Sequence, residues 1–146
     1  MVSALTAFDR CVSYLDKVFI SHLHVDHIGD LDALFIGGWV SNRVGPLQVW
    51  GPSGLRPETG TKYAIDRMRE VYTWDLTGRR GRMPSGGGRI EITEFDYAKS
   101  HVIYDRNGVK IKAWPATLPM PPGAPDPSEK TDASNWLAGG RVNLID

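Results

Sequence analysis

Apolar and polar positions alternate in a way that predicts three short strands in this 146-residue chain. Residues 17–21 are a short apolar run with β-branched and aromatic side chains, which is typical of a buried strand. Residues 46–51 predict a second strand, which ends at the Gly-Pro-Ser-Gly turn of residues 51–54. Residues 90–95 alternate strictly, as a strand with one buried face does.

Three other segments have apolar positions at helical spacing. One precedes residue 17, one follows Asp30, and one covers residues 56–76 as the longest predicted helix. Asp30 is a suitable residue for a helix N-cap. The apolar positions of the three segments are Leu5, Phe8, Val12 and Leu15; Leu31, Leu34, Phe35 and Ile36; and Ala64, Ile65, Met68, Val71 and Tyr72.

The remaining segments predict a loop, a hairpin and a tail. Residues 78–89 hold five glycines and predict a loop. Residues 102–104 and 109–114 predict a hairpin closed by Asn-Gly, the favoured pair for a tight turn. The order β-α-β-α-β-β indicates an α/β fold. We interpret residues 1–116 as one partial domain and the proline-rich residues 117–146 as an irregular or disordered tail.

Charge and composition narrow the function only a little. Seventeen basic and seventeen acidic residues give a formal net charge of zero, so the whole chain offers no electrostatic case for nucleic acid or membrane. Locally, the arginines at 79, 80 and 82 suit either a solvated loop, which we favour, or contact with phosphates. We interpret the tryptophans at 39, 50, 74 and 114 as packing residues.

Cellular location is predicted from what the sequence lacks. Cys11 is the only cysteine, so no disulfide forms within the chain. The longest apolar runs are too short for a membrane span, and residues 1–10 lack the pattern of a signal peptide. We therefore expect a cytoplasmic protein without a membrane partner.

The candidate chemistry lies in His22-Leu23-His24-Val25-Asp26-His27, directly after the first predicted strand. Imidazole and carboxylate groups are the usual protein ligands of zinc and of harder divalent ions. If residues 22–24 are extended, His22 and His24 point to the same side and can bind one ion. Asp26 and His27 can then serve a second ion where the chain turns into a helix.

The alternative interpretation is a run of surface histidines on a loop, or ordinary helix-capping residues. We favour metal binding because three histidines and an aspartate follow a buried strand and precede Gly29-Asp30.

The segment from Ile20 to Leu31 resembles the signature of metallo-β-lactamase-fold hydrolases. Residues 47–54 and 102–116 resemble the ribonuclease Z and arylsulfatase-like phosphodiesterase branch of these proteins. The resemblance covers about residues 12–116 and implies the N-terminal αβ half of an αββα sandwich. It also implies a hydrolase that attacks a phosphodiester or a related ester with a metal-bound hydroxide.

The resemblance assigns roles to the same four side chains. It implies that His22 and His24 bind a first metal and that Asp26 and His27 serve a second. Asp26 would also orient the nucleophile or pass a proton. The implied cofactor is a pair of divalent ions, usually zinc, with manganese or iron in some members. The implied substrate is a small ester or phosphodiester, and nucleic acid is a further possibility that the net charge does not support.

The resemblance stops before the implied ligand set is complete. Such a site needs two further histidines and a bridging aspartate, but His101 is the only histidine after the cluster. We interpret His101 as a surface residue at a strand end. We expect a fragment of a longer hydrolase. The alternatives are a degenerate, non-catalytic member and half of a site completed by a partner chain, which includes a homo-oligomer.

Overall fold

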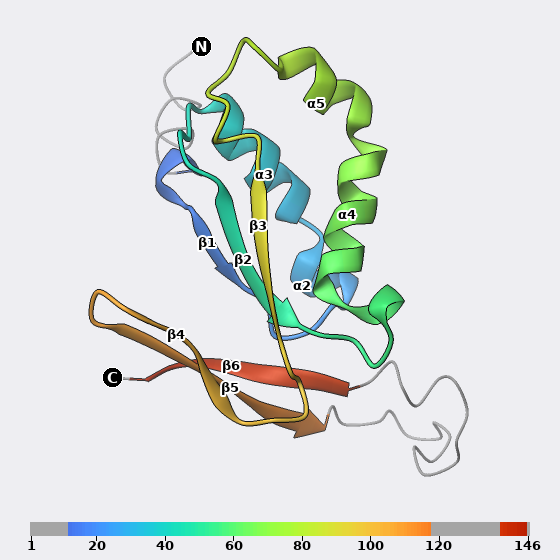
Figure 1. The fold of residues 1–146 in the computed structure, drawn as a ribbon, viewed down its shortest axis with the longest axis vertical. Coiled ribbons are helices and arrows are strands. Elements are labelled where there is room, and N and C mark those ends of the chain that lie inside the picture. Colours follow the sequence, from blue (N-terminus) through green and yellow to red (C-terminus); the bar gives the residue numbers. More distant parts are fainter. Residues whose placement is uncertain (1–11, 118–137, 146) are drawn as a thin grey trace.

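The computed structural model describes residues 12–117 and 138–145 and arranges them in one helical layer and two sheets (Figure 1). The elements in chain order are β1 (Lys17–Phe19), α2 (Val25–Ile28), α3 (Leu31–Val40), β2 (Leu47–Pro52), the 3-10 helix η1 (Pro57–Thr59), α4 (Thr61–Val71), α5 (Thr73–Arg79), β3 (Ile90–Phe95), β4 (His101–Arg106), β5 (Val109–Thr117) and β6 (Ala138–Ile145).

The first sheet is parallel and has the order β1-β2-β3. Its register places Val18 beside Val49 and Val49 beside Ile92. Parallel neighbours require long crossover connections, and the helices α3 and α4 lie in these connections on one face of the sheet (Figure 1). The strands predicted at 17–21, 46–51 and 90–95 are confirmed.

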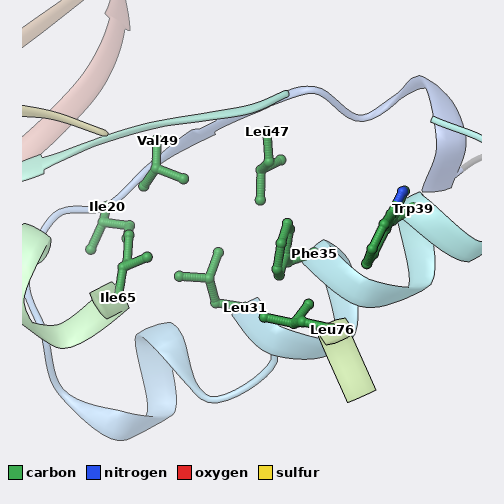
Figure 2. Packing of buried hydrophobic residues seen from close by; sticks show 8 residues of the cluster. All are labelled: Ile20, Leu31, Phe35, Trp39, Leu47, Val49, Ile65 and Leu76. Carbon is green, nitrogen blue, oxygen red and sulfur yellow. The ribbon is translucent and has the colours of Figure 1, made fainter. Parts of the chain in front are cut away.

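A hydrophobic core fills the space between this sheet and the helices (Figure 2). Leu31, Phe35 and Trp39 recur every four residues, so they form one stripe along α3 that faces Leu47 and Val49 of β2. Phe35 is only 1% exposed. This stripe confirms the helix predicted after Asp30 and fixes α3 against the sheet.

The opposite face of the parallel sheet packs against the second sheet, which is antiparallel with the order β4-β5-β6. Phe19 stacks on Trp50 with ring centroids 4.8 Å apart, and both rings meet the edge of Tyr104 from β4. Because neighbouring strand residues alternate between faces, Val18 joins the helical side and Phe19 the second sheet. The result confirms the predicted α/β class.

The hairpin between β4 and β5 turns where the sequence predicts it. Asn107 and Gly108 both have positive φ angles, of 54° and 77°. A tight two-residue hairpin turn needs this conformation at both central positions, and asparagine and glycine adopt it at the lowest cost.

The prediction of one helix over residues 56–76 is wrong. The chain forms η1, α4 and α5 there, and the break between α4 and α5 falls at Tyr72. The Tyr72 hydroxyl donates a hydrogen bond to the Asp32 carboxylate of α3, and Thr73 Oγ1 donates to the Glu70 carbonyl at 2.8 Å. Both hydrogen bonds stabilise the break between α4 and α5. Local helical periodicity does not reveal such contacts.

The prediction of irregular structure throughout residues 117–146 is also wrong, because residues 138–145 form β6. This strand pairs with β5 from Lys110↔Ile145 to Thr117↔Ala138. The free edge of β5 supplies the hydrogen-bonding partners, and such a partner is invisible in the local sequence. Residues 118–137, and most of the amphipathic segment predicted before residue 17, lie outside the described residues.

The loop predicted over residues 78–89 begins only after Arg79, because Gly78 and Arg79 still belong to α5. The second half of this loop packs tightly on α3. Trp39 Nε1 donates to the Pro84 carbonyl at 2.7 Å. The buried Arg43 donates from Nη2 to the carbonyls of Phe35 (2.8 Å) and Gly87 (3.3 Å). A Cβ at Gly87 would lie 2.0 Å from the Arg43 carbonyl oxygen, so glycine is required for this contact.

The tryptophans do not all pack in the core. Trp39 and Trp50 are buried and Trp114 is half-buried, but Trp74 on α5 is 88% exposed. The packing role predicted for Trp74 is therefore wrong. Helical spacing shows which residues share a side of a helix, but it does not show which side meets the core.

Candidate metal centre

The histidine segment leaves the carboxyl end of β1, at one edge of the parallel sheet. The backbone amide of Ile20 donates to the Trp50 carbonyl at 2.8 Å, so pairing with β2 continues one residue past β1. Ile20 is buried, whereas His22 is half-buried and His24 exposed. Ligands of open parallel sheets bind at this carboxyl edge, and the fold therefore presents the cluster at a favourable place.

The backbone around the cluster has the predicted form. His24 is extended, with φ −64° and ψ 146°, and α2 begins at the next residue. The amide of His27 then donates to the His24 carbonyl at 2.9 Å. This change from extended to helical backbone brings the three histidines together within six residues.

The three imidazole rings are in mutual contact through His22. Its ring centroid lies 4.7 Å from that of His24 and 4.0 Å from that of His27. The carboxylate of Asp26 approaches His27, with 3.5 Å between Oδ2 and Nε2. The structure thus brings the four predicted residues into one cluster.

The surroundings of His22 favour its neutral form. Partial burial lowers its pKa, and the neighbouring His27 and His24 lower it further, while the Asp26 carboxylate opposes them. Its Nδ1 lies 3.0 Å from the hydroxyl of Ser21, which orients the ring. A neutral imidazole with a fixed ring nitrogen is the form that binds metals.

The fit to a metal ion is only partial. The donor chemistry of the cluster suits a divalent ion. Among the residues that the structure describes, however, no three His, Cys, Asp or Glu side chains lie close enough together to hold an ion. The four residues therefore stay predicted ligands, and the described part of the chain does not complete a site.

His101 does not complete it either. It is the first residue of β4, and its Nδ1 lies 3.1 Å from the Lys99 carbonyl. Its ring meets the edge of Phe95, at 6.1 Å between centroids. This position at a strand end agrees with the interpretation of His101 as a surface residue.

Two cavities flank the short helix α2. One, of about 570 Å³, is lined by Asp26 and His27 together with apolar residues of β1 and α3. The other, of about 300 Å³, lies between α2, α3 and α4. No residue of α2 is buried, so the second half of the cluster is held mainly by its connections at both ends.

Two residues that the sequence did not single out position α4 beside the cluster. Thr61, which is fully buried, donates from Oγ1 to the Pro52 carbonyl at the end of β2. A Cβ at Gly51 would lie 2.2 Å from this hydroxyl, which explains the glycine near the end of β2. Glu94 of β3 accepts a hydrogen bond from the amide of Lys62 at 2.8 Å and caps α4. No local signal in the sequence marks either contact.

Comparison with known proteins assigns the family. Residues 14–111 match the pattern of the metallo-beta-lactamase superfamily, and the chain belongs to this superfamily. The match includes the parallel sheet, the histidine cluster, β4 and the first residues of β5. It confirms the fold as the N-terminal αβ half of the sandwich.

The relatives carry the names of ribonucleases. Ribonuclease Z of Mycobacterium marinum (strain ATCC BAA-535 / M) is 32% identical over 132 residues, 88% of this chain and 45% of that protein. Ribonuclease BN of Escherichia coli O7:K1 (strain IAI39 / ExPEC) is 50% identical over 106 residues, 73% of this chain and 28% of that protein. The chain thus spans less than half the length of these relatives. Among its described helices, none has the length and apolar character to cross a membrane.

Proposed function

We propose that this chain contributes part of the active site of a divalent-metal-dependent hydrolase that cleaves phosphodiester bonds. The observation that carries the proposal is the contact of three imidazole rings, with Asp26 beside them, at the carboxyl edge of the parallel sheet. The names of the relatives support a phosphodiester of RNA as the substrate. A cytoplasmic location and a homo-oligomeric state stay predictions from the sequence.

Each residue of the cluster has a proposed role. His22 and His24 hold one ion, zinc in the first instance, with manganese and iron as alternatives. Asp26 and His27 serve a second ion, and Asp26 orients the attacking water or accepts its proton. When bound, the metal would activate water and neutralise charge at the phosphorus. The remaining ligands come from residues outside the described part of the chain or from a partner chain.

The experiment is hydrolysis of bis-p-nitrophenyl phosphate by the purified chain, with zinc or manganese added. We expect turnover that depends on the added metal and is lost in His24→Ala. His101→Ala is the matched control, because it removes a histidine outside the cluster and should leave turnover unchanged. Equal turnover in both variants and the original chain would contradict the proposed roles.

A non-catalytic, degenerate domain is the second candidate. It is favoured by one observation, that no three ligands converge among the described residues. This candidate predicts no metal-dependent turnover at any zinc or manganese concentration at which the protein stays folded.

A further inference from the structure

The larger of the two cavities beside α2, about 570 Å³ in volume, lies between β1, α2 and α3. Cavities that bind small molecules in proteins measure roughly 300–1,000 Å³, so this one is large enough for a ligand. Asp26 and His27, two of the four predicted metal ligands, belong to its lining. A substituent of a molecule held at the histidine cluster can therefore reach into the cavity.

The cavity exists because α3 turns small residues toward it. Ala33, Gly37 and Ser41 recur every four residues and line the cavity, while the aromatic side chains of α3 face the core. A Cβ at Gly37 would meet only Val12 Cγ1, at 3.9 Å, so there is free space beside the helix. β1 is an edge strand, and within the described residues no further strand pairs with its other side (Figure 1).

The inner wall of the cavity is apolar. Ile20 and Leu31 are buried, and the half-buried Val18 and Leu34 complete this wall. Their hydrocarbon side chains offer a ligand neither a hydrogen-bond donor nor an acceptor. The wall therefore favours an apolar group, and each CH₂ that a ligand buries against it raises the affinity about fourfold.

The rim of the cavity is exposed and acidic. Asp26 and Asp30, the N-cap of α3, are both exposed and both belong to the lining. Among the described residues of the lining, His27 is the only basic one, and its Nε2 lies 3.5 Å from Asp26. Two carboxylates repel a phosphodiester anion, so the charge of the rim keeps a phosphate out of the cavity. The space is left to an uncharged substituent.

We propose that this cavity binds an uncharged aromatic ester group of the substrate, while the phosphodiester group itself stays at the histidine cluster. The apolar wall supplies the affinity, the acidic rim excludes the anionic part, and the shared residues Asp26 and His27 place the two parts side by side. This inference rests on the proposed function. It adds to it a preference for esters with an apolar aromatic group over esters with small alkyl groups.

The first test is binding of N-phenyl-1-naphthylamine, an uncharged probe that fluoresces in apolar sites, to the full chain in EDTA. Phenyl acetate should displace the probe, whereas methyl acetate at the same concentration should not, because it lacks the aromatic group. Ala33→Trp fills the cavity from its exposed side and should raise the Kd of the probe about tenfold or more. Ala64→Trp is the matched control, because Ala64 lines the smaller cavity beside α2 and its replacement should leave this Kd unchanged.

The second test adds zinc or manganese and compares two phosphodiesters with the same leaving group. The ratio of kcat/KM for bis-p-nitrophenyl phosphate to that for methyl p-nitrophenyl phosphate should fall in Ala33→Trp and stay unchanged in Ala64→Trp. Turnover of the methyl ester tests the proposed function separately, since its methyl group does not need the cavity. An unchanged ratio in Ala33→Trp would contradict this inference and leave the proposed function intact, whereas probe binding without turnover of either ester would contradict the proposed function.

Three further results would overturn the inference: no binding of the probe, equal displacement by the two acetate esters, or a larger loss of affinity in Ala64→Trp than in Ala33→Trp. A Kd of the probe that rises with protein concentration would also overturn it and would assign the cavity to contact between copies of the chain. Because Ala33 is exposed, an unchanged melting temperature of Ala33→Trp shows that its fold is intact. The comparison of the two acetate esters needs no variant and decides the matter if Ala33→Trp fails to fold.

Discussion

Replacing His24 by alanine measures how much of a metal site this chain holds by itself. Zinc sites with a full set of four ligands contribute about 10–16 kcal/mol at neutral pH. The described residues bring no three ligands to one point, so about half of this free energy is expected. That is about 5–8 kcal/mol, or a Kd for zinc between about 200 µM and about 1 µM.

The variant should then lose most of the remaining affinity. Removing one ligand of a pair costs about 2.5–4 kcal/mol on the same scale, which raises the Kd by a factor of about 70 to 800. Isothermal titration of chelator-free protein with zinc chloride measures both values. His101→Ala is the control, since its ring packs on Phe95 away from the cluster. Nanomolar affinity, or two ions retained per chain and lost in His24→Ala, would refute the reasoning, because a complete ligand set would then exist.

The remaining predictions concern contacts that stabilise the fold around the histidine cluster. Urea unfolding measures the free energy of unfolding of each variant. Gly51→Ala should lower the free energy of unfolding by about 1–3 kcal/mol, because the new Cβ would overlap the Thr61 side chain at the start of α4. A Cβ at Gly45 meets nothing within 4 Å, so Gly45→Ala should leave the stability unchanged. Equal effects of the two would contradict the close packing. Glu94→Ala should cost about 1 kcal/mol, since the second amide of α4 loses its cap, and an unchanged midpoint would argue against that bond. Phe35→Ala should cost about 3–5 kcal/mol, and Val44→Ala, at a 69% exposed position, should change stability by less than about 0.5 kcal/mol. A small loss of stability in Phe35→Ala would mean that the core can collapse into the space of the missing ring.

The sequence by itself determined those features that depend on neighbouring residues. The strands followed from apolar runs and from alternation, since successive side chains of a strand point to opposite faces. The hairpin turn followed from Asn107-Gly108, because these residues tolerate the positive φ angles of a tight turn. The histidine cluster was visible because its members lie within six residues of one another, so their proximity needs no tertiary contact.

Only the tertiary structure decided the features that depend on distant partners. The helix predicted over residues 56–76 breaks at Tyr72, whose hydroxyl binds Asp32 forty positions earlier in the chain. Strand β6 exists because β5 offers it a free edge. The exposure of Trp74 depends on which side of α5 faces the core, and the cap that Glu94 provides depends on where β3 ends relative to α4. Such contacts join segments far apart in sequence, so local patterns of hydrophobic and polar residues do not reveal them.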